Sequence, residues 1–216
     1  MRVRDCMTSP VHVIGPDAPA WEALGLMRRH RIRRLPVMDG DALVGIVSWT
    51  DVVRMQPPAV GGAWHMPNLS AGVLVLHLMT PAPLVVDPAT RLEQVAAIMR
   101  QRKIGGLPVM EAGRLIGIIT ESDVFEAFAE VLRVGPGELR LHVAVGSITV
   151  ELPRIVGSLA RAGVPIVSLQ TLRVRGVEAI DLVVHERDAR RAREGLARLA
   201  LQVDVVDAAA VGEGVR

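Results

Sequence analysis

Aromatic residues are scarce in this chain of 216 residues, which contains three Trp, two Phe and no Tyr. Any hydrophobic core must therefore be aliphatic. Half of the residues are hydrophobic, which is enough for one or two packed domains. The lack of aromatics also leaves few side chains on which the bases of single-stranded nucleic acid could stack.

Cysteine occurs once, at Cys6, and lysine once, at Lys103. A single cysteine excludes an internal disulfide framework and favours a reducing, cytoplasmic compartment. The formal net charge of +2 is too small to indicate a nucleic-acid-binding surface, so binding through arginine-rich segments is the least favoured function. The N-terminus shows no signal-peptide pattern and the longest apolar runs are strand-sized, so no membrane span is expected.

Residue sets for the common catalytic chemistries are also missing from the sequence. The six histidines show no His-x-x-x-His spacing, and no activating base lies near Cys6 in the sequence. No phosphate-binding P-loop and no dinucleotide-binding glycine fingerprint occurs. We therefore expect a protein that is not an enzyme and has no metal site.

An internal repeat with a period of 72 residues dominates the sequence. Residues 3–53 align with residues 75–125 without a gap, and 17 of these 51 pairs are identical. One copy of about 50 residues is too small to bury its own sheet, so the two copies are expected to pack as a pseudo-twofold pair. The predicted organisation is a first repeat (1–55), a linker (56–74) in which Trp64-His65-Met66 forms a packing anchor, and a second repeat (75–134).

Both copies predict the same order of secondary structure. Apolar residues at helical spacing predict one helix, and short apolar runs bounded by Gly and Asp turns predict two strands. A second helix is expected to start at Ser48 or Thr120. The expected first helices are Ala20–His30 and Leu92–Arg102, and the expected extended segments and strands are Val11–Ile14, Leu35–Met38, Leu43–Val47, Pro83–Val86, Leu107–Met110 and Leu115–Ile119.

The composition changes at Gly135-Pro136-Gly137, which predicts a domain boundary. Residues 138–207 then predict the order βαββαβ, the ferredoxin-like plan, and residues 208–216 are expected to fray. Pro153 is expected in the first turn of a helix. The expected elements are the strands Leu139–Val145, Pro165–Val174, Val177–Val184 and Gln202–Val206 and the helices Leu152–Ala162 and Asp188–Leu199.

The repeat resembles the CBS domain. Its marks here are CMTSP and LMTPAP at the starts of the copies, RLPVM and GLPVM on the middle strands, and GIVSWTD and GIITESD at the last strand–helix junctions. Two such copies resemble a CBS pair, or Bateman module, and ELPRIVGSLARAGVPIVSL with the following βαβ resembles an ACT domain. The whole order resembles the AcuB family of acetoin utilization proteins. This implies an α/β (α+β) fold of two β-α-β-β-α repeats and a ferredoxin-like ACT domain.

The resemblance implies a regulatory protein that binds an adenosine nucleotide in clefts between the two sheets. AMP, ADP, ATP or S-adenosylmethionine would be a regulatory ligand and not an obligatory cofactor. The nucleotide-binding residues that we expect on the strands are those that could flank a purine. They are Leu107, Pro108 and Val109 in the second copy and Leu35 and Pro36 in the first.

The strand–helix junctions hold a hydroxyl and a carboxylate three residues apart, Ser48 with Asp51 and Thr120 with Asp123. One interpretation is that each pair only caps its helix. The other is that the hydroxyl and the free N–H groups of the helix start favour an oxygen-rich ligand, while the carboxylate accepts both ribose hydroxyls. The occurrence of two such junctions within a CBS pair favours ligand binding.

A basic run from Arg28 to Arg34 follows the first predicted helix. It is either a solvated helix end, where cations are favourable, or a phosphate-binding segment in which Arg33 and Arg34 contact the ligand. Gly105 and Gly106 take their places in the second copy, so the two clefts are expected to differ in affinity for phosphate. Glu121 disfavours a polyphosphate beside the second junction.

The ACT-like domain is expected mainly to mediate association. ACT domains often bind amino acids at a dimer interface with a Gly near the helix start, but Arg154 stands there in this chain. This departure argues against amino-acid binding. CBS pairs and ACT domains commonly form dimers, so the resemblance implies a homodimer. An alternative function for the whole chain is a ligand-free assembly module that regulates a partner enzyme or transporter.

Overall fold

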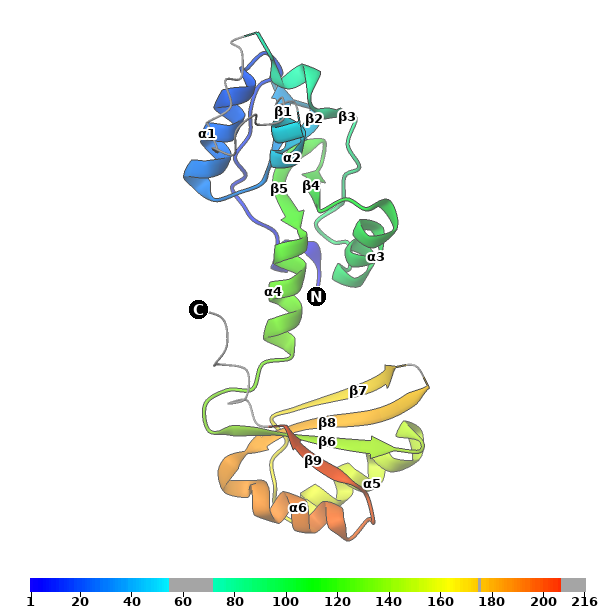
Figure 1. Ribbon diagram of the computed structural model, residues 1–216. Coiled ribbons are helices and arrows are strands. Elements are labelled where there is room, and N and C mark those ends of the chain that lie inside the picture. Colours follow the sequence, from blue (N-terminus) through cyan, green and yellow to red (C-terminus); the bar gives the residue numbers. More distant parts are fainter. Residues whose placement is uncertain (55–71, 175, 207–216) are drawn as a thin grey trace. The chain divides into compact units, whose positions relative to one another are not determined.

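The computed structural model describes residues 1–54, 72–174 and 176–206 (Figure 1). The chain divides into two compact units, Met1–Val131 and Leu132–Arg216. The predicted packing anchor Trp64-His65-Met66, the tail 208–216 and all of the linker except residues 72–74 lie outside the described residues. Within the described ranges, every helix is too short or too polar to traverse a bilayer.

The first unit contains both repeats, and its two first helices have the predicted bounds. Each strand of the hairpins extends about one residue beyond the prediction at each end, so Ser48 and Thr120 end strands and the helices begin one residue later. The first repeat contains η1 (Val3–Asp5), α1 (Ala20–His30), β1 (Arg34–Asp39), β2 (Ala42–Ser48) and α2 (Trp49–Arg54). The second contains η2 (Val75–His77), β3 (Thr80–Pro81), α3 (Leu92–Arg102), β4 (Gly106–Glu111), β5 (Arg114–Thr120) and α4 (Glu121–Val131).

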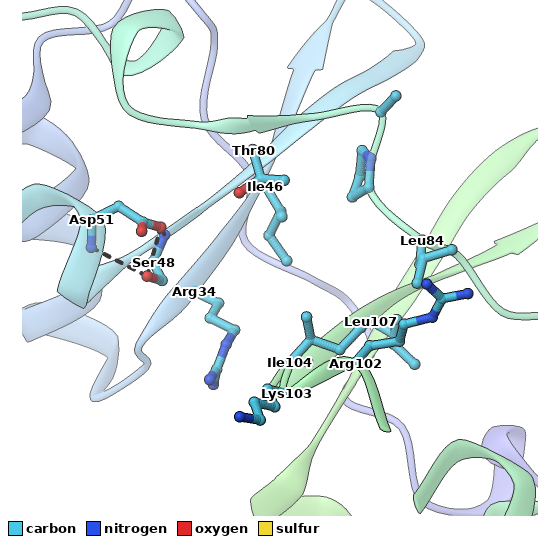
Figure 2. Close-up of a pocket in the computed structure, with 14 residues that line it drawn as sticks. Arg34, Ile46, Ser48, Asp51, Thr80, Leu84, Arg102, Lys103, Ile104 and Leu107 are labelled. Carbon is cyan, nitrogen blue, oxygen red and sulfur yellow. Dashed lines mark hydrogen bonds between the residues drawn. The ribbon is translucent and has the colours of Figure 1, made fainter. Parts of the chain in front are cut away.

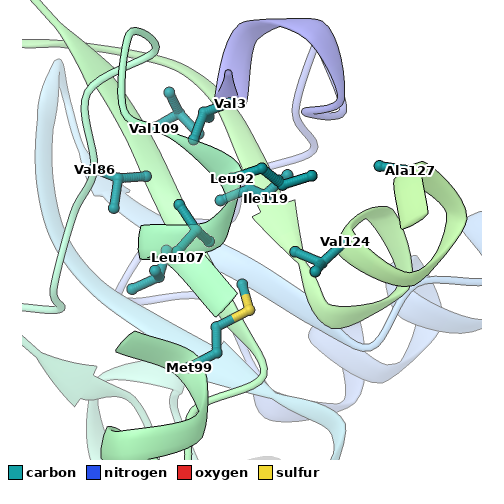
Figure 3. Close-up of a cluster of buried hydrophobic side chains, with 10 residues drawn as sticks. Val3, Val86, Leu92, Met99, Leu107, Val109, Ile119, Val124 and Ala127 are labelled. Carbon is teal, nitrogen blue, oxygen red and sulfur yellow. The ribbon is translucent and has the colours of Figure 1, made fainter. Parts of the chain in front are cut away.

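The two repeats exchange their opening segments. Val3 is fully buried in the core of the second repeat, beside Val109 (Figure 3), and Val75 is fully buried in the core of the first. Thr8 exchanges backbone hydrogen bonds with Ile118 on β5, and β3 pairs antiparallel with β2. Each repeat therefore completes the hydrophobic core and the sheet of the other.

The central glycines of β2 and β5 make this exchange possible. A Cβ on Gly45 would lie 2.5 Å from Sδ of Met79, and a Cβ on Gly117 would lie 2.9 Å from Sδ of Met7. Contacts this short force neighbouring atoms to move, so a side chain at either position would displace the methionine of the other repeat. Glycine at these two equivalent places therefore leaves room for the methionine of the other repeat.

The second unit has the predicted ferredoxin-like topology, with strands in the order β7-β8-β6-β9 and all neighbours antiparallel. One face of the sheet packs with both helices around Leu141, Ile155, Ile180, Leu182 and Leu196, which are fully buried. The elements are β6 (Glu138–Val145), α5 (Ile148–Arg161), β7 (Ser168–Val174), β8 (Val177–His185), η3 (Glu186–Asp188), α6 (Ala189–Ala197) and β9 (Val203–Val206).

Helix α5 begins one turn before the prediction, at Ile148, so the placement of Pro153 in its first turn was wrong. Oε2 of Glu178 on β8 accepts the backbone N–H of Ile148 at 2.7 Å and satisfies a donor at the start of the helix. This hydrogen bond, helped by Arg173, lowers the pKa of Glu178. Because the cap comes from a residue 30 positions away, the local sequence could not reveal it.

Candidate functional site: two clefts shared by the repeats

The hydroxyl–carboxylate pairs form at both strand–helix junctions of the first unit. Oδ2 of Asp51 accepts the backbone N–H of Ser48 at 2.8 Å and the Ser48 hydroxyl at 2.6 Å. Oδ2 of Asp123 accepts the same two groups of Thr120, both at 2.7 Å. In each pair one carboxylate oxygen is therefore used to cap the helix, as the first interpretation expects.

The other carboxylate oxygens are less engaged. Oδ1 of Asp123 accepts the Thr8 hydroxyl at a long distance of 3.4 Å. Among the residues that the structure describes, no hydrogen bond reaches Oδ1 of Asp51. Capping and ligand binding are thus compatible, because each carboxylate caps with one oxygen and retains acceptor capacity on the second.

Ser48 and Asp51 face a cleft of about 460 Å³, which we call the Ser48 cleft (Figure 2). Figure 2 shows this pair on one side, Arg102 and Lys103 of the second repeat on the opposite side, and Arg34 between them. The full lining is Arg34, Ile46, Ser48, Asp51, Thr80, Ala82, Pro83, Leu84, Arg102, Lys103, Ile104, Gly105, Gly106 and Leu107. Its size and its mixture of aliphatic and polar groups suit a small-molecule ligand.

Thr120 and Asp123 face a second cleft of about 390 Å³, which we call the Thr120 cleft. Its cations come from the first repeat, and Glu121 adds a negative charge. The full lining is Thr8, Val11, His12, Arg31, Ile32, Arg33, Arg34, Ile118, Thr120, Glu121, Ser122 and Asp123. Every one of these residues except Ser122 and Glu121 has its 72-residue counterpart in the lining of the Ser48 cleft.

The repeats contribute to the clefts in a crossed arrangement, which corrects the sequence-based grouping. Arg33 was expected beside Ser48 but lines the Thr120 cleft, and Leu107 was expected beside Thr120 but lines the Ser48 cleft. Each cleft combines the junction of one repeat with the opening segment and the first-strand entry of the other. The cause is the exchange of opening segments, which brings Thr80 next to β2 and Thr8 next to β5.

The strand residues expected to flank a purine lie mostly inside the hydrophobic cores. Leu35 and Val109 are fully buried core residues, Pro36 and Pro108 are also buried, and Leu107 is only 1% exposed. Of these five, only Leu107 belongs to a cleft lining. The apolar surface of the clefts comes instead from Ile46, Leu84 and Ile104 in one and from Val11, Ile32 and Ile118 in the other.

Two cleft cations have a backbone conformation that is unfavourable for their residue type. Arg31 ends α1 with a φ of 54° and Lys103 ends α3 with a φ of 53°, both left-handed. Gly is the residue that takes this position at least cost. Non-glycine residues in such conformations cluster at ligand-binding sites, and here a cation stands at the equivalent place of each cleft.

Arg34 borders both clefts. Burial lowers the pKa of its guanidinium, Glu121 and Asp51 oppose this shift, and Arg33 adds to it. The opposing carboxylates come from the two different clefts, so the guanidinium interacts with the charges of both sites.

A pair of stacked histidines stands at the Thr120 cleft. The rings of His12, which lines this cleft, and His30, at the end of α1, have centroids 3.7 Å apart. Desolvation, the His12 ring and Arg29 lower the pKa of His30 from its ordinary value of 6.5.

Among the described residues, no group of three or more His, Cys, Asp or Glu side chains could hold a metal ion.

Sequence reasoning missed Thr8 and Thr80 as cleft residues. The signal was present, because the two threonines are an identical pair of the 72-residue repeat within CMTSP and LMTPAP. Their place in the opposite repeat could not be inferred, since a repeat alignment does not show which copy an exchanged segment packs against.

Two comparisons describe the relatives of this sequence. The family model of the CBS domain matches twice, at residues 3–57 and 75–130. The chloroplastic CBS domain-containing protein CBSX1 of Arabidopsis thaliana is 37% identical over 146 residues, which are 58% of this chain and 62% of that protein. CBSX2 of the same plant is 34% identical over 154 residues, 61% of this chain and 65% of that protein. The chain therefore spans less than two thirds of the length of either relative.

Solved structures share the fold of about three fifths of this chain. The crystal structure of CBSX2 in complex with AMP is 33% identical, with a TM-score of 0.51, and the match covers 61% of this chain and 98% of that one. A Vibrio cholerae structure described as an acetoin utilization protein (AcuB) is 30% identical, with a TM-score of 0.52, and the match covers 61% of this chain and 93% of that one.

Proposed function

This chain belongs to the CBS domain family, and we propose that it is a non-catalytic regulatory protein that senses an adenosine nucleotide. One observation supports this most directly: each hydroxyl–carboxylate pair faces cations of the other repeat across a cleft of nucleotide size. The structure of the relative CBSX2, described as a complex with AMP, matches 61% of this chain. AMP is therefore the first ligand to test.

In the Ser48 cleft, the available oxygen of Asp51 would accept the ribose hydroxyls. The half-buried side chains of Ile46 and Ile104 would contact the purine, and backbone groups at the cleft wall would pair with its edge. Arg102 and Lys103 would neutralise the phosphate through charge-assisted hydrogen bonds. All three parts of a nucleoside monophosphate thus have suitable partners in one cleft.

In the Thr120 cleft, Asp123 would take the role of Asp51, with Arg31 and Arg33 as phosphate ligands. Glu121 lines the same cleft and repels additional negative charge. We expect this cleft to prefer AMP to ADP and ATP. S-adenosylmethionine, whose sulfonium end is cationic, is the alternative ligand that Glu121 would favour.

The crossed arrangement explains how a ligand could regulate. A nucleotide in either cleft would contact a carboxylate of one repeat and cations of the other, and so stabilise one relative position of the two repeats. A ligand shifts such an equilibrium only by its differential affinity for the two states. Binding that spans both repeats supplies this difference, and a partner protein or the second unit would respond to it.

Titration calorimetry of the full chain tests the proposal. Adenosine, AMP, ADP, ATP and S-adenosylmethionine would be titrated separately into ligand-free protein, and we expect AMP to bind at two sites. The double variant Asp51→Ala/Asp123→Ala should lose binding, and the exposed Asp17→Ala is the matched control. Heats equal to the buffer blank for all five compounds would refute nucleotide sensing.

Self-association is a second property that we propose, and exposed aromatic side chains on α4 support it. Phe125 is 73% exposed and Phe128 is 44% exposed, and the two lie on one face of the helix because they are three residues apart. A homodimer that covers this face would bury them. Light scattering at micromolar concentration should give twice the chain mass, and Phe125→Ser should reduce it to a monomer mass. A monomer in the unaltered protein would exclude the dimer.

We propose that the second unit contributes to association and readout, not to amino-acid binding. Oε2 of Glu178 already occupies the start of α5, where the free N–H groups would otherwise attract a ligand carboxylate. Its assignment to the ACT family remains a prediction. The domain bounds, with a second unit from residue 138 to 207, and a cytoplasmic location also remain predictions.

A further inference from the structure

A single guanidinium stands where the two clefts meet, and two glycines make room for it. Gly105 and Gly106 occupy, 72 residues later, the places of Arg33 and Arg34. A Cβ on Gly105 would lie 2.0 Å from Nη2 of Arg34, and a Cβ on Gly106 would lie 2.9 Å from its Cδ. The side chain of Arg34 therefore fills the space that the second repeat leaves open.

Apart from Arg34, the clefts have separate cations. Arg102 and Lys103 line only the Ser48 cleft, and Arg31 and Arg33 line only the Thr120 cleft. Of the residues in the two linings, Arg34 alone occurs in both. A phosphate monoester has a charge of about −1.5 to −2 at pH 7, so two bound nucleotides would present two such charges to one guanidinium.

We propose that Arg34 is a shared phosphate ligand through which a nucleotide in one cleft weakens the binding of a phosphate-bearing nucleotide in the other. This inference rests on the proposed nucleotide binding. A guanidinium carries a single positive charge and binds a phosphate most strongly through a planar fork of N–H donors, so a second phosphate meets a charge that is already neutralised. The phosphate of the first nucleotide pairs with Arg34, and the phosphate of the second pairs only with the separate cations of its own cleft.

The coupling depends on the ligand's phosphate. Adenosine has a ribose and a base but no phosphate, so its two binding steps are independent. The coupling is also reciprocal, because linkage requires each cleft to affect the other by the same factor. For AMP we expect about a tenfold loss of affinity in the second step, within the usual range for coupled sites.

Calorimetry on single-cleft variants measures this factor. Asp51→Ala leaves only the Thr120 cleft functional and Asp123→Ala only the Ser48 cleft, so each variant gives the affinity of one cleft with Arg34 available. The unaltered chain gives two stepwise association constants, and each single-cleft variant gives one association constant. The coupling factor is the product of the two stepwise constants divided by the product of the two single-cleft constants. We expect about 0.1 for AMP and about 1 for adenosine.

If either alanine variant fails to fold, Asp51→Asn or Asp123→Asn takes its place, because the amide keeps the size of the side chain and an oxygen that can accept the capping hydrogen bonds.

Two variants locate the coupling at Arg34. Arg34→Gln should weaken AMP binding in both clefts and bring the coupling factor close to 1, whereas Arg33→Gln should weaken only the Thr120 cleft. Gly105→Ala should also abolish the coupling, because its Cβ displaces the guanidinium, together with the Glu121 carboxylate that would lie 2.7 Å from it, without removing either charge. Gly25→Ala, whose Cβ meets no atom within 4 Å, is the matched control.

The outcomes separate this inference from the proposed function. If adenosine and AMP both fail to bind, nucleotide sensing itself is wrong. If both bind but the coupling factor for AMP is 1, or if Arg34→Gln leaves a factor near 0.1, the shared ligand is wrong and nucleotide sensing stands. Persistent coupling in Arg34→Gln would indicate direct repulsion between the phosphates.

Discussion

Val3 donates its backbone N–H to the carbonyl oxygen of Thr90 at 2.9 Å, although the two residues belong to different repeats. The equivalent contact in the other direction joins Val75 to Ala18, also at 2.9 Å. These bonds hold each opening segment on the opposite repeat and place Thr8 and Thr80 at the clefts. Folding of the first unit and formation of its sites thus depend on the same exchanged segments.

Truncating an exchanged valine should destabilise both repeats together. Val3→Ala and Val75→Ala each remove two fully buried methyl groups, which should lower the free energy of unfolding by about 2 kcal/mol. Chemical denaturation followed by circular dichroism would measure this loss. Val13→Ala, at a side chain that is 42% exposed, should change stability by less than about 0.5 kcal/mol. An unchanged midpoint for Val3→Ala would contradict the exchange.

Mutations at the Thr120 junction should separate helix capping from ribose binding. Asp123→Ala removes the helix cap and the ribose acceptor, so it should cost about 1 kcal/mol of stability and reduce the adenosine stoichiometry from two to one. Thr120→Ala keeps the carboxylate and should retain both sites. Thermal unfolding and calorimetry measure the two effects. Retention of both sites in Asp123→Ala would mean that the carboxylate only caps the helix.

Acidification should destabilise the first unit through His30. Its lowered pKa means that the folded state binds fewer protons than the unfolded state just below the ordinary value of 6.5. Stability is therefore complete above this value and falls as the pH drops through it. Denaturation midpoints measured between about pH 8 and pH 5 should show this fall, and His30→Gln should flatten it. An identical pH profile in both proteins would contradict the prediction.

Glu178 should stabilise the start of α5 in a pH-dependent way. Because its pKa is lowered from 4.5, its contribution is present above that value and is lost as the pH falls through the lower folded-state value. Glu178→Gln should speed amide hydrogen exchange at Ile148 and in the first turn at neutral pH, whereas the exposed Glu186→Gln should not. Equal exchange in all three proteins would show that the cap is dispensable.

Local patterns predicted most elements of the fold. The helices Ala20–His30 and Leu92–Arg102 were predicted with their observed bounds because apolar spacing and the following turns are local signals. The order βαββαβ was predicted for the same reason. The start of α5 was missed because its cap, Glu178, is distant in sequence.

The candidate site could be predicted only in parts. The pairs Ser48–Asp51 and Thr120–Asp123 and the phosphate-side residues Arg33 and Arg34 do line clefts. Their grouping was wrong because the exchange between repeats is a tertiary property that no local pattern reports. Leu35, Pro36, Pro108 and Val109 were misplaced because an apolar strand residue next to a site and one in the core have the same sequence signature.

The exchanged opening segments also constrain how such a protein could have arisen. A polypeptide with one copy of this repeat would lack both its final sheet partner and the valine that seals its core. Two such polypeptides could complete each other by exchanging their opening segments, as a domain-swapped dimer does. Duplication and fusion of such a unit would make the exchange intramolecular, and the two halves of this chain differ at the cleft, with Arg33 and Arg34 in one and Gly105 and Gly106 in the other.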